Sequence, residues 1–228
     1  MLGALDRDAD AGDDSYQRRQ TRLAAVLLEQ AQGSREAGAE QLDAFFAEDR
    51  ERLGDAGVEW WLWLRSLRAR GDLDGARAQL PRLARWFGEG DADTRILHAL
   101  ILAEQAWAER DETAALREYD NALQRAEQLG VPALIARVAV SFGENLVADR
   151  QFEQAAGIVG RASRWSREDY PCAILEARLF RALGDDASLR AALLRLRALA
   201  GQRPIPDFVI PAAGPLSQRP PEPRGNAG

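Results

Sequence analysis

The sequence contains no lysine, and it has only one cysteine and one histidine. Without lysine, the chain cannot form a Schiff base and has no counterpart of the lysine that binds phosphate in nucleotide-binding loops. Cys172 and His98 are too few to build a zinc site of the usual cysteine and histidine kind, and one cysteine cannot close an internal disulfide. We therefore expect no metal, no cofactor and a non-catalytic protein.

Long apolar runs are also missing from the chain. No stretch approaches the roughly 18 consecutive apolar residues that a bilayer-spanning helix needs, and the acidic amino terminus lacks the apolar core of a signal peptide. The formal net charge of −6 is unfavourable for binding phosphate backbones. We expect a cytoplasmic protein that binds neither membranes nor nucleic acid. All 30 basic residues are arginine, which together with abundant alanine indicates a GC-rich bacterial genome.

The residues that are abundant divide the chain into three zones. Residues 1–14 are acidic, and we expect a flexible terminus there. Residues 15–201 are rich in alanine, leucine, arginine and glutamate, which are good helix formers. Residues 202–228 hold seven of the ten prolines, and proline blocks helix continuation. We therefore expect a helical domain over 15–201 followed by a disordered, proline-rich tail.

Glycine and aspartate interrupt the middle zone at regular places. Gly-Asp pairs occur at 54–55, 71–72, 90–91 and 184–185. Glycine suits the left-handed residue that ends a helix, and aspartate suits the cap that begins the next one. These and similar signals predict ten helices, and the short connections make them five consecutive hairpins. The predicted helices are 15–32, 36–53, 57–70, 73–88, 93–110, 112–129, 133–149, 152–166, 171–183 and 186–201.

A common register relates the five predicted hairpins. A small or apolar residue recurs near the start of each second helix at intervals of roughly 34–40 residues, the length of a two-helix repeat. These markers are Ala39, Ala76, Ala115, Ala155 and Leu189. At the matching place in each first helix lie Leu27, Leu64, Ala103, Gly143 and Ala177. We expect the two helices of a hairpin to approach closely there, which explains a glycine inside a helix.

This pattern resembles the tetratricopeptide repeat (TPR), in which a tryptophan, a leucine, a glycine and small residues recur at fixed spacing. The best matches are "WWLWLRSLRARGDLDGARAQL", with Trp60, Leu64, Gly71 and Ala76, and "FGENLVADRQFEQAAGIVGRAS", with Gly143, Phe152, Ala155 and Ala162. Most intervals exceed the family's usual length of about 34 residues. The resemblance implies an all-α fold, a right-handed α-α superhelix (TPR-like solenoid) of about five helical hairpins. It also implies a concave groove that binds an extended or helical peptide.

The stretch "EWWLWLRSLR" places three tryptophans within four positions. Because successive helical residues lie about 100° apart, Trp60 and Trp63 fall on one apolar stripe. Trp61 lies about 100° away from Trp60, on the face that carries Arg65 and Arg68. We expect Trp60 and Trp63 to pack in the core and Trp61 to be available with the two arginines.

The register of the resembled family assigns one face of each first helix to the groove. The resulting candidates are Trp61, Arg65, Arg68, Leu97, Leu100, Glu104, Trp107, Arg137, Val140, Glu144, Val147, Ile174, Arg178 and Arg181. An apolar floor with a few oriented charges is typical of a groove that binds a partner helix or peptide. We therefore expect a protein–protein interaction scaffold that acts as an adaptor, assembly factor or regulatory factor. The structural alternative is that these residues belong to the core or to a solvated surface.

Two other functions remain open from the sequence. The stretch "RAEQLGVPALIARV" is similar to the helical repeats of bacterial transcriptional activators of the maltose-regulator type, which favours a sensor module of a regulator or signalling protein. The other alternative is an enzyme in a helical bundle with a polar pocket around His98, although we expect that histidine to be packed.

Two further features have weaker implications. Cys172 follows Pro171 at a predicted helix start, a position that can lower a thiol pKa. Without a partner histidine, we expect Cys172 to be a small buried residue. The tail segment "PIPDFVIP" is apolar, and it is a candidate for self-association or for folding back into the groove.

Overall fold

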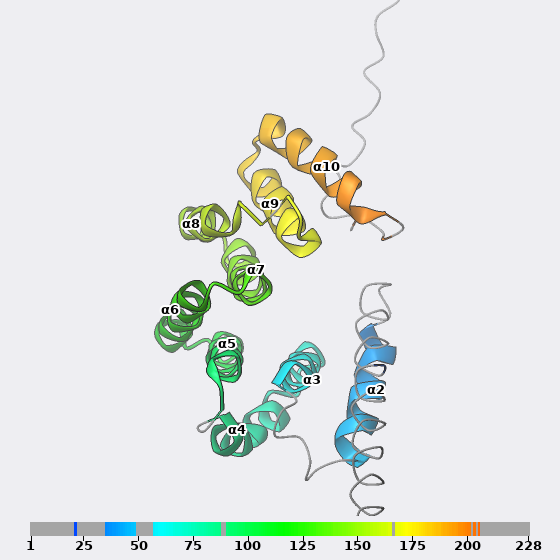
Figure 1. Cartoon of the computed structure of the whole chain (residues 1–228), viewed down its shortest axis with the longest axis vertical. Coiled ribbons are helices and arrows are strands. Elements are labelled where there is room, and N and C mark those ends of the chain that lie inside the picture. The colour runs from blue at the N-terminus through cyan, green and yellow to red at the C-terminus, as the bar shows by residue number, and fades with distance from the viewer. Residues whose placement is uncertain are drawn as a thin grey trace, which may run out of the picture.

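The computed structural model describes residues 35–48, 57–87, 90–165 and 167–201, together with positions 21, 203 and 205. Within these ranges the chain is all-helical and has no β-strand (Figure 1). The expectations for residues 1–14, for a helix over 15–32 and for the tail from 206 onward lie outside the described residues. The helices are α2 (Arg35–Glu48), α3 (Gly57–Ala69), α4 (Leu73–Phe87), α5 (Ala92–Ala108), α6 (Glu112–Leu129), α7 (Pro132–Ala148), α8 (Phe152–Ala162), α9 (Tyr170–Leu183) and α10 (Asp186–Ala200).

The helix ends follow the local chemistry of the sequence. The side chains of Asp91, Asp111, Asp169 and Asp185 each accept a hydrogen bond from a backbone N–H of the helix that follows. Gly130 and Gly184 end α6 and α9 in the left-handed conformation. These caps satisfy backbone groups that a helix terminus leaves unpaired. The predicted boundaries that fall on described residues are therefore confirmed to within one or two residues, except that α8 ends earlier than predicted. The predicted end of the helix over 36–53 lies outside the described residues.

The helices pack in an alternating pattern. Consecutive helices contact each other from α2 to α10, and α3, α5, α7 and α9 additionally contact one another in sequence, each touching the next. Figure 1 shows these four helices along the concave side of a curved row, with α4, α6 and α8 on the other side. We call α3, α5, α7 and α9 the inner row. None of the described helices combines the length and apolarity that a membrane crossing requires.

The register inferred from the sequence coincides with the core. The markers Ala76, Ala115, Ala155 and Leu189 are all buried, and so is Ala39 of α2. At the matching place in the inner row, Leu64, Ala103, Gly143 and Ala177 are also buried. The alanines and the glycine at these positions let neighbouring helices come close. Larger buried side chains elsewhere, such as Tyr119, fill the space between the helices.

Gly143 is the position where this close packing is tightest. A methyl group placed on Gly143 would lie 2.6 Å from Cδ2 of Leu175, which is itself buried. Leu175 belongs to α9, the next helix of the inner row, whereas the sequence predicted close approach to the partner helix within the hairpin. That prediction is corrected: the glycine accommodates the contact between successive inner helices, because α7 packs against α9 as well as α8.

Substitution of Gly143 tests this contact. We expect Gly143→Ala to destabilise the protein by about 1 kcal/mol, because overpacking costs about 1–3 kcal/mol and exceeds the gain in helix propensity. Gly157 provides a matched control, since it is exposed inside α8 and a methyl group there would meet nothing within 4 Å. Gly157→Ala is expected to stabilise by about 0.5–1 kcal/mol. Urea denaturation measures both, and equal effects of the two substitutions would contradict the proposed crowding.

Candidate functional site

The three tryptophans of α3 divide between two faces of the helix. Trp60 is 1% exposed, and the ring of Trp63 stacks on Phe46 of α2 at 4.3 Å between centroids. Trp61 lies on the other face, where the guanidinium groups of Arg65 and Arg137 approach its ring at 5.4 and 5.3 Å. Trp61 is only 7% exposed, however. The expectation that it is available on the surface is therefore wrong, because the two arginines and the neighbouring inner helices cover it.

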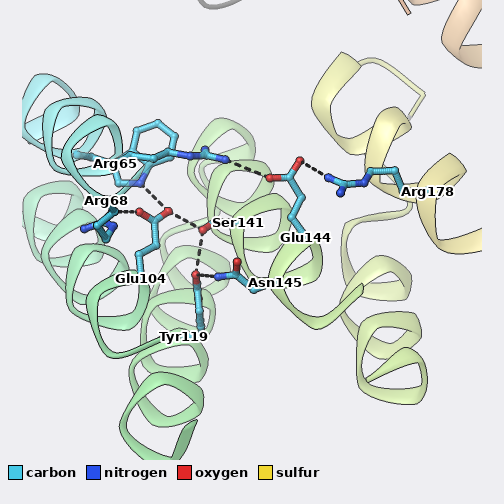
Figure 2. Close-up of polar contacts among 9 residues, drawn as sticks. Arg65, Arg68, Glu104, Tyr119, Ser141, Glu144, Asn145 and Arg178 are labelled. Atoms are coloured by element: carbon cyan, nitrogen blue, oxygen red, sulfur yellow. Dashed lines mark hydrogen bonds and ion pairs between the residues drawn. The ribbon is translucent and has the colours of Figure 1, made fainter. Parts of the chain in front are cut away.

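The carboxylate of Glu104 lies at the centre of the inner row. Glu104 is buried on α5, and one of its oxygens accepts a hydrogen bond from the indole Nε1–H of Trp61 on α3, at 3.0 Å. Ser141 of α7 donates its hydroxyl to the same oxygen at 2.6 Å, and Arg68 of α3 forms an ion pair with the other oxygen (Figure 2). Donors from two helices thus converge on one carboxylate supplied by a third.

A buried hydroxyl network continues from Ser141. The hydroxyl of Tyr119 lies 3.0 Å from that of Ser141, and Asn145 donates its Nδ2 to Tyr119 at 2.7 Å. Burial raises the pKa of the Tyr119 phenol, and the nearby charge of Glu104 raises it further. Tyr119 therefore stays neutral and acts as a structural hydrogen-bonding group.

Glu144 forms a second, more exposed cluster on the same face. Its two oxygens accept from Arg65 of α3 at 3.1 Å and from Arg178 of α9 at 3.2 Å. Side-chain exposure is 45% for Arg65 and 27% for Glu144 and Arg178. Figure 2 shows Glu144 between the two arginines. The cluster therefore joins three of the four inner helices, and solvent screens it more than it screens the pair at Glu104.

A pocket of about 290 Å³ lies where α3, α5 and α7 meet. Its polar and aromatic lining consists of Arg65, Arg68, Glu104, Trp107, Ser141, Glu144 and Asn145. Trp107 is half-buried and makes a T-shaped contact with the ring of Tyr119. Nη1 of Arg68 is buried without a hydrogen-bond partner among the described residues. The pocket thus presents charged and amide groups beside one aromatic ring.

The structure brings together eight of the residues proposed from the sequence. They are Trp61, Arg65, Arg68, Glu104, Trp107, Arg137, Glu144 and Arg178. Leu97 and Leu100 are 5% and 0% exposed within the core, so the expectation that they line a groove is wrong. Val140, Val147 and Ile174 are partly buried and pack against core residues, and Arg181 is exposed on α9. The aliphatic candidates therefore contribute to packing.

Three residues of the site were not among the sequence candidates. Ser141 and Asn145 flank Glu144 and lie four residues apart on one face of α7, inside the apolar run "VAVSFGENLV". Polar side chains inside an apolar helical run are usually buried and hydrogen-bonded, so the sequence did contain a signal for these two residues. The hydrogen bond of Tyr119 to Ser141 joins α6 to α7 and therefore depends on tertiary packing.

The single histidine and the single cysteine lie away from this pocket. His98 stacks on Phe87 with ring centroids 5.4 Å apart. Cys172 is buried, as expected, and burial together with the nearby Asp169 raises the pKa of its thiol. The suggestion that the helix start lowers this pKa is therefore wrong, because burial disfavours the thiolate and Asp169 caps the same helix terminus with a negative charge. No group of metal-binding side chains occurs among the described residues.

Comparisons of the chain with protein-family models, with curated proteins and with solved structures find no match. The resemblance to the tetratricopeptide repeat therefore stays a prediction that rests on the residues named above.

The buried pair of Arg68 and Glu104 predicts a large and specific effect on stability. We expect Glu104→Ala to destabilise the protein by about 3–5 kcal/mol, because it leaves the Arg68 charge buried without its carboxylate. Glu127→Ala is a matched control, since Glu127 pairs with Arg161 but both side chains are about one-third exposed. Its expected cost is at most about 1 kcal/mol. Chemical denaturation measures both, and a cost for Glu104→Ala no greater than that of the control would argue against the network.

The environment of His98 predicts a pH dependence. Burial lowers its pKa below the usual value of 6.5, although Glu118 opposes the shift. The unfolded chain therefore binds a proton more readily, so stability is full above pH 6.5 and falls as the pH drops below it. We expect an NMR titration to place the His98 pKa below 6.5. His98→Gln should flatten the fall in denaturation midpoint as the pH drops below about 6.5. A pKa above the usual value would contradict the burial.

Proposed function

We propose that the protein is a non-catalytic interaction scaffold that binds a peptide or helix of a partner protein along the inner row. It would then act as an adaptor, assembly factor or regulatory factor. The supporting observation is the convergence of Arg65, Glu104, Glu144 and Arg178 from four helices on one connected face. These residues are far apart in the sequence, and packing every second helix against the next aligns them.

We also propose that the fold is a right-handed, TPR-like solenoid of about five hairpins. The contacts from α3 to α5, α5 to α7 and α7 to α9 support this, because a stack of helical hairpins makes contacts between every second helix. A solenoid places one helix of each hairpin on a concave surface, which is the surface that such proteins use for binding.

The polar groups of this face are suited to recognition rather than to strong hydrophobic association. Arg65 and Arg178 are already held in position by Glu144, so little side-chain entropy is lost when a partner binds. Trp107 adds a partly exposed aromatic surface at the pocket, and aromatic and arginine side chains dominate binding energy at interfaces. We therefore expect a partner segment that carries both an apolar contact and charged groups.

Charge reversal on the inner row tests the proposal. We expect Arg65→Glu to weaken partner capture at least about tenfold, because it places two carboxylates opposite each other and removes an arginine contact. Arg117→Glu is the matched control, since Arg117 is exposed on α6, on the opposite side of the row. Quantitative mass spectrometry after affinity capture measures both variants against the wild type, after circular dichroism has shown that each is folded.

A photo-crosslinking residue at position 107 provides the structural check. Crosslinks to the captured partner are expected there and not from the same residue placed at position 117. If every captured protein were retained equally by both charge-reversal variants, the inner row would not be the binding surface.

A further inference from the structure

One cation in the pocket has hydrogen-bonding capacity that the protein does not use. The Arg68 side chain is 7% exposed and pairs through Nη2 with Glu104, while Nη1 has no partner among the described residues. A buried N–H without an acceptor is unfavourable, and the penalty is larger for a charged group. An oxygen atom from a ligand would remove that penalty.

A second cation beside it can change its partner. Arg65 is the most exposed member of its cluster and bonds Oε2 of Glu144. Glu144 also accepts from Arg178 through its other oxygen. If Arg65 turns toward a ligand, Glu144 therefore keeps one cationic partner and is not left uncompensated. Nη1 of Arg68 has almost no exposed surface, so a ligand reaches it only when a pocket side chain moves. Arg65 is the most exposed of the four charged side chains that line the pocket.

The charges around the pocket favour an anion. The charged side chains that line the pocket balance, because two are arginines and two are glutamates. Two further arginines adjoin them, one paired with Glu144 and one over the ring of Trp61, so the surrounding network is positive although the chain as a whole carries a charge of −6. Its arginines are Arg65, Arg68, Arg137 and Arg178. Guanidinium groups bind carboxylate and phosphate through paired N–H groups, and the interaction is strengthened in a partly desolvated site.

We propose that the pocket binds an oxyanion group, a carboxylate or a phosphate, between Arg65 and Arg68, with Arg65 exchanging Glu144 for the ligand. A volume of about 290 Å³ admits a small organic acid or a single acidic group, and Trp107 provides an aromatic wall for the attached carbon atoms. The inference goes beyond the proposed scaffold function, because a free anion can occupy the pocket whether or not a partner protein binds.

Isothermal titration calorimetry on the full chain tests the site. The probes are inorganic phosphate and glutarate, each added at constant ionic strength set with chloride. We expect at least one to bind with a dissociation constant of about 1 mM or lower. Arg68→Lys keeps the positive charge beside Glu104 but removes the paired donors, and it should weaken binding at least about fivefold.

Two glutamate variants test the exchange of Arg65. Glu144→Gln weakens the hold on Arg65, so we expect binding to become about threefold tighter. Glu153→Gln removes the same charge from an exposed position on α8 and should leave the affinity unchanged. The comparison of these two variants distinguishes the release of Arg65 from a general change in net charge. It also tests the site if Arg68→Lys does not fold.

Specific results would overturn the proposal. They are an absence of binding of both anions at about 10 mM, equal affinity in the wild type and Arg68→Lys, or equal effects of the two glutamate variants. Binding of phosphate alone or of glutarate alone supports the site and identifies the preferred oxyanion. If neither anion binds, affinity capture with the Arg65→Glu variant still tests the scaffold function. If that capture shows no effect, the result of the anion titration still stands.

Discussion

The buried carboxylate of Glu104 is the interaction on which the arrangement of the inner row depends. Removing a carboxylate from water costs several kcal/mol, and only well-placed donors offset that cost. Trp61 and Arg68 supply them from α3, and Ser141 supplies one from α7. All three donors reach Glu104 only when α3 and α7 are correctly placed on either side of α5. The network therefore selects one arrangement of these helices, a role for which polar groups are better suited than interchangeable apolar contacts.

Close helix packing makes this arrangement possible. Alanine at position 103 precedes Glu104, and glycine at position 143 precedes Glu144. These small residues are buried against neighbouring helices, while the adjacent glutamates form ion pairs with arginines of the other inner helices. In both α5 and α7 the small packing residue comes one position before the glutamate. The placement of each helix therefore determines its close packing and its ion pairs at the same time. A shift of one helix along the other would disrupt both.

The two glutamates have different consequences for function. Glu104 is enclosed and fully engaged, so it acts mainly as a structural anchor. Glu144 is partly exposed and shares its charge between Arg65 and Arg178, which lets one partner leave while the other remains. The proposed oxyanion site depends on this second arrangement. The buried contacts of Glu104 can therefore hold the helices in place while the ion pairs of Glu144 change.

The sequence by itself determined most of the described helices, most of their ends and the small residues at which neighbouring helices pack. Capping aspartates, terminal glycines and the spacing of small residues act over a few neighbouring residues, so they can be read locally. The angular separation of Trp61 from Trp60 was predictable for the same reason. Only the tertiary structure decided that Trp61 is covered, that Leu100 belongs to the core and that Gly143 faces Leu175. Burial and pairing depend on which helices become neighbours in space, and periodicity along one helix carries no information about the side chains that a distant helix brings against it.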